Sequence, residues 1–137
     1  MSTGGGHVAG FYTQQSAFSD PGALADRYAG LPADPAGLVE IPRGLMIHRL
    51  EAPLFDFEIP EERLHHDAET RCLDDILRII TERCAGPLDR PRAPEDRFVG
   101  LCRDFALLHC SLLRHIGIPA RLRCGFADYF GPARRST

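Results

Sequence analysis

Hydrophobic positions recur at helical spacing in two parts of the chain. Between residues 61 and 83 apolar side chains fall on one stripe, every three or four residues, and charged side chains fall opposite. The pattern predicts a single amphipathic helix, ended by the Gly-Pro pair at 86–87. Asp67 lies four residues from both Arg63 and Arg71, which predicts ion pairs on the solvated face of that helix.

The second periodic stretch predicts a helix over residues 101–116. Gly117 supplies a left-handed cap there, and Pro119 prevents continuation of the helix. Residues 120–126 then alternate well enough for a strand. The predicted buried face of the helix comprises Cys102, Phe105, Ala106, Leu108, His109, Leu112, Leu113 and Ile116, while Arg103, Leu107, Ser111 and Arg114 point away.

The first 60 residues contain many prolines and little periodicity, which predicts an irregular segment that wraps a core formed elsewhere. Ser19-Asp20-Pro21 has the composition of a helix start, and Asp34-Pro35 repeats it. The apolar run at 44–47 fits either a strand or a buried helix. We therefore expect one domain over 1–137, with an N-terminal wrap (1–60) and a helical core (61–137) that ends in its first strand.

The composition is that of a globular domain: 137 residues, 44% apolar and 26% charged, with a net charge of −3. The mildly acidic balance argues against nucleic acid as a partner. No apolar run is long enough to span a bilayer, so no membrane association is predicted. Residues 1–18 lack the charged start and apolar stretch of a secretory signal, and a cytoplasmic location is the expectation.

All sixteen basic residues are arginine, which excludes chemistry that depends on a lysine, such as phosphate-loop or Schiff-base catalysis. The five cysteines form an odd set without zinc-ligand spacing, which predicts free thiols and neither a metal nor a cofactor. Cys110 is predicted on the polar side of its helix. The others apart from Cys102 are predicted to be packing thiols: Cys72, Cys84 and Cys124.

Cys102 stands apart because the pattern places it in the first turn of the second predicted helix, directly after Gly100 and Leu101. Free backbone N–H groups and the positive end of a helix dipole stabilise a thiolate at such a position. The same N–H groups can receive an oxyanion that develops on an attacked carbonyl. Cysteine is otherwise a common buried residue, so this placement is what distinguishes a candidate nucleophile from a core thiol.

The same residues carry a family resemblance. Gly-Leu-Cys-Arg-Asp-Phe-Ala-Leu-Leu occupies 100–108, Leu-Leu-Arg-His-Ile-Gly-Ile-Pro-Ala-Arg occupies 112–121, and Gly-Phe occupies 125–126. This segment resembles the nucleophile segment of the transglutaminase-like superfamily, and residues 19–22 and 47–49 are similar to the upstream region of bacterial members. The resemblance implies an α+β, papain-like fold with the nucleophile helix against an antiparallel sheet. It also implies that Cys102 forms a thioester with a peptide or amide substrate.

In that family a histidine and an aspartate on the next strands complete a thiol triad. Only eleven residues follow Phe126; none is histidine, and Asp128 is the one acid among them. Without a histidine Asp128 has nothing to orient. We therefore expect a truncated core, predominantly helical, with one or two strands at its C-terminus and only the nucleophile of the triad.

The histidines that the pattern places are not expected to replace the missing base, while the two that it does not place stay open. His109 is seven residues beyond Cys102, about 10 Å along a helix axis, outside the roughly 3 Å reach of a general base. It is therefore expected to be a core histidine, with His115 farther still. His65 and His66 are expected on a helix surface, and two more have no predicted place: His7 and His48.

Two functions remain open at this point. The first is the N-terminal portion of a transglutaminase-like cysteine enzyme, which transfers an acyl group from an amide to water or an amine and is inactive as this chain. The second is a non-catalytic interaction module on the same scaffold, and metal binding ranks behind both. The apolar face of the Cys102 helix lacks enough strands to cover it, which predicts exposed apolar surface or self-association.

Overall fold

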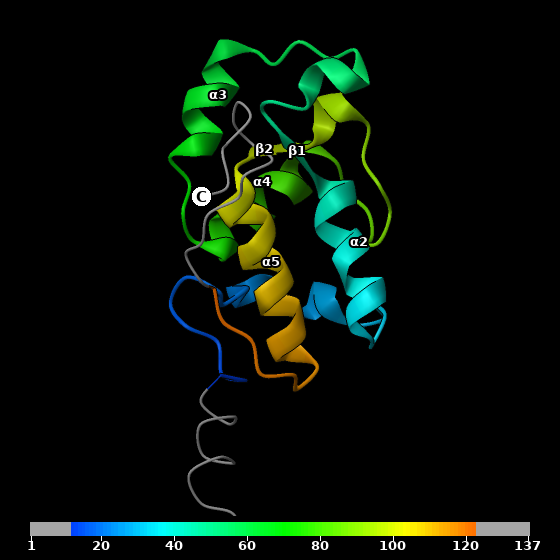
Figure 1. Cartoon of the computed structure of the whole chain (residues 1–137), viewed down its shortest axis with the longest axis vertical. Helices are drawn as coiled ribbons and strands as arrows, with labels where there is room; N and C mark the ends of the chain where they lie inside the picture. The colour runs from blue at the N-terminus through cyan, green and yellow to red at the C-terminus, as the bar shows by residue number, and fades with distance from the viewer. Residues whose placement is uncertain (1–11, 123–137) are drawn as a thin grey trace, which may run out of the picture.

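The computed structural model describes residues 12–122 and has an α+β architecture, mostly helical around one small sheet (Figure 1). The predicted fold class is thereby confirmed. The elements in chain order are the 3-10 helix η1 (Gly22–Tyr28), helix α2 (Pro35–Leu45), strand β1 (Met46–His48), the 3-10 helix η2 (Ala52–Phe55), helices α3 (Glu61–Ala68) and α4 (Leu73–Arg83), the 3-10 helix η3 (Pro94–Asp96), strand β2 (Phe98–Gly100) and helix α5 (Cys102–His115).

Strands β1 and β2 run parallel and lie side by side at the centre of the molecule, with Met46 opposite Phe98 and His48 opposite Gly100. Both strands are almost entirely buried, which is typical of parallel strands covered on both faces. The apolar run that fitted either strand or helix is therefore divided, because α2 ends at Leu45 and β1 begins at Met46.

The position of the strands differs from the expectation of strands at the C-terminus. Among the described residues both strands precede α5, and 118–122 are irregular. The rest of the predicted strand at 120–126 lies outside the described residues. Strands of three residues show no usable alternation in the sequence, so periodicity could not locate β1 and β2.

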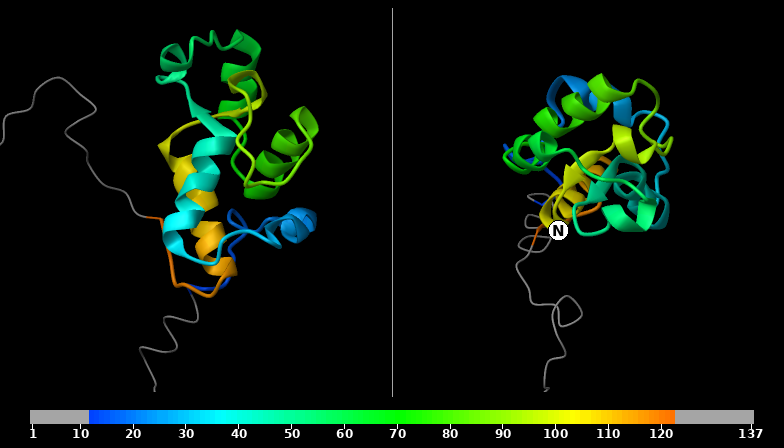
Figure 2. Two further views of the ribbon diagram at one scale, coloured as in Figure 1. Left: turned by 90° about the vertical axis from the view of Figure 1, so that its right-hand side faces the viewer. Right: turned by 90° about the horizontal axis from the view of Figure 1, so that it is seen from above.

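Helices surround the sheet on all sides that the views show. Helix α5 lies in front with α4 behind it and α2 beside it, and η1 lies at the back, next to α4 (Figures 1 and 2). A single large apolar cluster joins residues of η1, α2, α4, β2 and α5, and it includes Tyr28, Leu38, Ile80, Phe98 and Leu108. Within the described residues no helix is both long and apolar enough to cross a membrane.

The stretch before residue 60 contains more regular structure than a wrap of short turns. The predicted start of α2 is confirmed, because the Asp34 carboxylate accepts a hydrogen bond from Gly37 N at 2.9 Å and Pro35 occupies the first turn. Helix α2 then buries Leu38 and Ile41 in the central cluster. These residues form part of the core itself.

The single helix predicted over 61–83 is wrong: the structure has two helices, α3 and α4, separated by residues 69–72. The buried carboxylate of Asp67 accounts for the break. It receives two hydrogen bonds of 2.7 Å from Arg83 and one of 2.9 Å from Val99 N. Sixteen residues of continuous helix would separate Asp67 from Arg83 by about 24 Å, so their pairing requires the chain to turn.

The ion pairs predicted on a solvated face are corrected by the same observation. Asp67 is 0% exposed and pairs with Arg83 instead of Arg63 or Arg71. A buried carboxylate is tolerated here because every bond it receives is charge-assisted or comes from a buried backbone N–H. On α4 the ion pair observed joins Arg78 to Asp75.

Helix α5 has nearly its predicted bounds, and Gly117 has the positive φ of +87° expected of a left-handed cap. Its buried face is rotated from the prediction: Leu107, Cys110 and Ser111 are buried, while Cys102 and Ala106 are exposed. The burial of Ser111 is possible because its hydroxyl shares a 2.7 Å hydrogen bond with the hydroxyl of Tyr28. A pattern that assigns polar residues to solvent cannot anticipate such a satisfied pair.

Candidate active site

Cys102 is the first residue of α5, and its side chain is exposed. It follows the buried strand β2 after a single intervening residue, so the thiol lies at the carboxyl edge of the sheet. Gly100 allows close packing at this point, because a Cβ there would lie 3.3 Å from Asp104 Cβ and 3.5 Å from Met46 Sδ. The Asp104 carboxylate accepts a 2.9 Å hydrogen bond from Leu101 N and so fixes the start of the helix.

His48 lies directly beside this thiol. It is the last residue of β1, opposite Gly100 in the parallel register, and its Nε2 is 3.7 Å from Cys102 Sγ. The expectation that no histidine reaches Cys102 is therefore wrong. The two short buried strands, which end at His48 and just before Cys102, were not recognised in the sequence. Because the carboxyl ends of parallel strands meet at one edge of the sheet, their pairing brings His48 beside Cys102.

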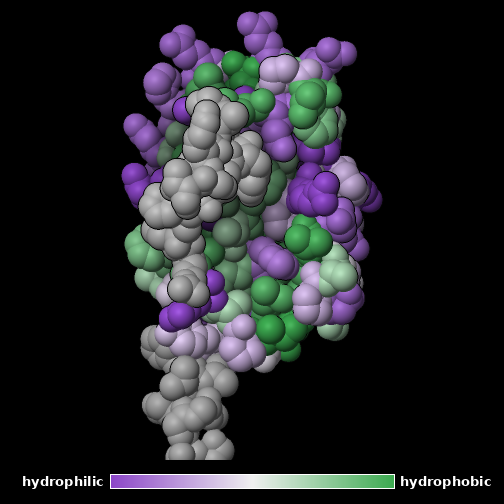
Figure 3. Space-filling model, viewed as in Figure 1, coloured by the Kyte–Doolittle hydropathy of each residue, from purple (hydrophilic) through white to green (hydrophobic). Residues whose placement is uncertain are grey.

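Cys102 and His48 both line a groove of about 1000 Å³ between α2, η2 and α5. Phe105 and Ala106 of α5 form one wall, and exposed apolar side chains such as Leu50 stand on the other. Figure 3 shows pale and green atoms in the hollow beside α5 on the face turned to the viewer. Cys102 and His48 are thus accessible to a ligand that binds in the groove with its acyl group beside apolar side chains.

Comparison with protein families gives a match that includes Cys102 but begins after His48. Residues 81–133 match the model of the transglutaminase-like superfamily. The matched segment contains β2, Cys102 and all of α5, and over this segment the match confirms the resemblance suspected from the sequence. Neither the search of curated proteins nor the search of solved structures gave a match.

His109 lines the same groove. The sequence predicted a satisfied core histidine, but this side chain is only partly buried. Its Nε2 is buried and, among the described residues, has no hydrogen-bond partner. Nothing in the described contacts joins it to Cys102.

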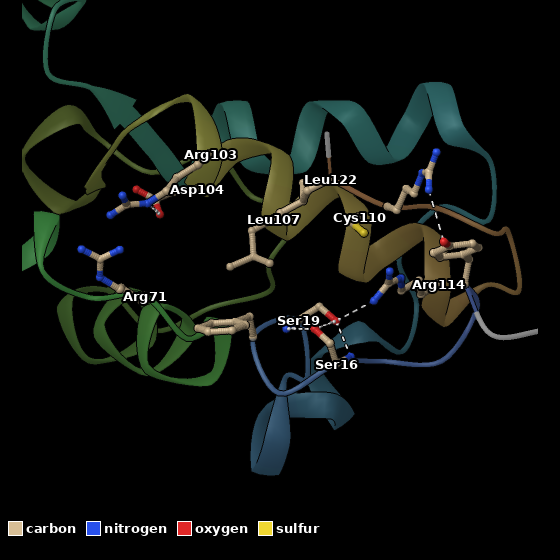
Figure 4. Close-up of a pocket in the computed structure, with 12 residues that line it drawn as sticks. Ser16, Ser19, Arg71, Arg103, Asp104, Leu107, Cys110, Arg114 and Leu122 are labelled. Atoms are coloured by element: carbon tan, nitrogen blue, oxygen red, sulfur yellow. Dashed lines mark hydrogen bonds and ion pairs between the residues drawn. The ribbon is translucent and has the colours of Figure 1, made fainter. Parts of the chain in front are cut away.

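A second cavity of about 490 Å³ lies along another face of α5 (Figure 4). Asp104 and Arg71 stand at one end of it, and Arg114 reaches across to Ser19, donating a 3.2 Å hydrogen bond to its hydroxyl. Burial raises the pKa of the Asp104 carboxyl, and the neighbouring Arg103 guanidinium opposes part of that shift. Among the charged side chains that line this cavity arginines outnumber Asp104, and apolar side chains such as Leu107 lie between them.

Cys110 lines this second cavity and is buried, which corrects its predicted place on a polar face. Burial raises the pKa of its thiol, and the nearby charge of Arg114 opposes the rise. The four described cysteines are free thiols, as predicted, and Cys124 lies outside the described residues. Of the four, Cys102 is the exposed one.

The remaining histidines stand apart from the thiol. His65 is exposed and lies 4.0 Å from Glu61, and His66 is 3.4 Å from Asp67. His115 packs edge-on against the ring of Tyr28, with ring centroids 5.1 Å apart. His7 and Asp128 lie outside the described residues.

One group in the described part of the chain has the proximity of a metal site: ligand atoms of Cys72, Asp74 and Asp75 lie within 4.8 Å of one another. Local contacts account for this grouping. Asp75 forms an ion pair with Arg78 at 2.7 Å, and Asp74 accepts a hydrogen bond from Asp75 N at 2.8 Å. These are the contacts of an acidic helix start, and they carry no metal assignment.

Proposed function

We propose that the chain carries Cys102, the nucleophile of acyl transfer in a transglutaminase-like cysteine enzyme, and that it is inactive toward amides as this chain. The observation that carries the proposal is an exposed thiol at the start of α5, open to a large groove and 3.7 Å from an imidazole nitrogen. The match of residues 81–133 to the transglutaminase-like superfamily supports the same chemistry. The proposed substrates are peptide or other amide groups.

In the first step the Cys102 thiolate forms a bond to the acyl carbon, and the carbonyl electron pair moves to oxygen. The first intrahelical hydrogen bond runs from Asp104 N to Leu101 O, so the N–H groups of Cys102 and Arg103 precede the helix ladder. They can stabilise the oxyanion. The tetrahedral intermediate then expels the leaving group, and water or an amine cleaves the thioester.

Whether the tetrahedral intermediate can collapse to the thioester depends on the leaving group. An amide nitrogen must receive a proton as it departs, and acid–base groups contribute about 10²- to 10⁴-fold to such steps. A phenolate departs from an activated ester without that help. The imidazole beside Cys102 has Leu50 N on its Nδ1 where a thiol triad has a carboxylate, so His48 lacks the partner that makes a triad histidine an effective acid and base. We therefore expect this chain to form a slow covalent adduct with activated esters and to show no turnover of peptide or glutamine amides.

The test is intact-mass spectrometry after incubation with an activated phenyl ester. One acyl group should add to the protein, and Cys102→Ala should abolish the addition. Cys110→Ala is the matched control, because it removes a thiol of the same helix and should leave the adduct unchanged. An adduct that persists in Cys102→Ala, or robust amide hydrolysis by residues 1–137, would contradict the proposal.

A second candidate is an interaction module, and the apolar rim of the groove favours it. Leu50 is 71% exposed, Leu54 82% and Phe55 42%, and these side chains cluster around η2. Exposed apolar patches of this kind mark contact surfaces. Light scattering that rises with concentration would show self-association, whereas a strictly monomeric protein that forms no Cys102 adduct would favour the module.

A further inference from the structure

We propose that His48 is a positioning residue that donates its Nε2 hydrogen to the sulfur of Cys102 and does not act as the general base of the site. This inference rests on the proposed role of Cys102 and assigns the part played by its neighbour. It follows from the contacts on the two ring nitrogens of His48. Each nitrogen has its own partner, and together the partners determine where the proton lies.

The Nδ1 atom accepts a hydrogen bond of 3.1 Å from Leu50 N. A backbone N–H can only donate, so Nδ1 must present a lone pair to it. A neutral imidazole then carries its proton on Nε2, the nitrogen that lies 3.7 Å from Cys102 Sγ. The turn after β1 therefore selects the tautomer that offers a hydrogen to the sulfur.

This tautomer restricts the chemistry of His48. An Nε2–H group can donate to a thiolate, but it has no lone pair to take the proton of the Cys102 thiol. In a triad the third group accepts the Nδ1 hydrogen and leaves Nε2 free as a base. Here the contact on Nδ1 has the opposite polarity, because Leu50 N is a donor. The thiol proton must therefore leave to water, and His48 stabilises the thiolate that remains.

The backbone holds the imidazole in this orientation. Met46 and Ile47 anchor β1 in the buried sheet, and the parallel register fixes His48 opposite Gly100. Glu51 N donates a 2.8 Å hydrogen bond to His48 O, which closes the turn that carries Leu50 N. The Nδ1 contact is consequently built into the strand end and does not depend on a mobile side chain.

The first test is the rate at which iodoacetamide alkylates Cys102 near neutral pH, followed by peptide mapping. His48→Ala should lower the rate about tenfold, the effect of removing one hydrogen bond to a charged sulfur. His48→Gln should retain most of the rate, because the glutamine amide nitrogen can occupy the place of Nε2 and donate. His65→Ala, on the exposed face of α3, is the matched control and should leave the rate unchanged.

Equal losses in His48→Ala and His48→Gln, or no loss in either, would overturn the proposal. The second test needs no variant that might fail to fold: nitrogen-15 NMR of the unaltered chain should show a pyridine-type Nδ1 and a pyrrole-type Nε2 for His48. The reverse tautomer would overturn the proposal. Neither test uses an acyl substrate, so a missing ester adduct would count against the proposed function alone.

Discussion

The two thiols of helix α5 occupy contrasting surroundings although they are eight residues apart on one element. Cys102 begins the helix, is exposed to the larger groove and faces the imidazole of His48. Cys110 is buried beside the second cavity, where desolvation raises its pKa. The comparison shows that the position on the helix, and not the residue type, separates a candidate nucleophile from a packing thiol.

The contrast predicts a large difference in labelling. With a sub-stoichiometric alkylating reagent at neutral pH, Cys102 should react at least about tenfold faster than Cys110, since burial both shields Cys110 and lowers its thiolate fraction. Peptide mapping by mass spectrometry measures the ratio. Equal labelling of the two thiols would contradict the argument that the start of helix α5 makes the thiol of Cys102 more reactive.

Measuring the labelling rates at higher pH tests whether burial controls the reactivity of Cys110. Because burial raises the pKa of Cys110, its labelling rate in the folded chain should still increase with pH above the ordinary pKa of a thiol, where the rate for the same thiol unfolded in urea has levelled off. The ratio of the folded to the unfolded labelling rate of Cys110 should therefore rise in that range. A ratio that stays constant there would show that desolvation does not govern Cys110.

A smaller effect is expected from Asp104→Asn, on the face of α5 that carries the second cavity. Burial raises the pKa of Asp104 in the folded chain, so the folded state binds its proton more tightly, and this group costs stability as pH rises through its titration. Asparagine keeps an acceptor for Leu101 N and carries no charge. We expect the free energy of unfolding near pH 7 to change by less than about 1 kcal/mol, in the stabilising direction.

Urea unfolding at neutral and at acidic pH checks whether Asp104→Asn raises the free energy of unfolding as predicted. The advantage of Asp104→Asn should vanish below the ordinary pKa of an aspartate, where the native side chain is protonated in both states. Cys102 labelling should not change, because the helix start keeps its hydrogen bond. A variant that is less stable at neutral pH would mean that the attraction between Arg103 and Asp104 outweighs the desolvation of the carboxylate.

Features that depend on neighbours in the sequence were predictable. The bounds of α5, the left-handed Gly117 and the cap at Asp34 all follow from contacts within one helical turn. The break between α3 and α4 was not predictable from the sequence, because it depends on the buried ion pair of Asp67 with Arg83, which are sixteen residues apart. A solvated ion pair and a buried one look alike in a hydropathy pattern.

The two residues of the candidate site also differ in whether they could be predicted from the sequence. Cys102 was predicted from its helix position and from the motif around it, whereas His48 was left without a place. Its role depends on the register of two three-residue strands, and strands that short have no detectable period. The hydrogen bond from Leu50 N, which sets the tautomer, is a property of the folded turn and has no signature in residue types.

The parallel pairing of β1 with β2 has a consequence for how the protein folds. Parallel strands require a long crossover, and here that crossover comprises η2, α3, α4 and η3. His48 and Cys102 are 54 positions apart in the sequence, and the chain between them must therefore close before the two side chains meet. Contacts of such high sequence separation form slowly, because chain entropy is lost before they can compensate for it. The imidazole–thiol contact consequently belongs to the completed fold, and early helical intermediates would contain the thiol without its partner.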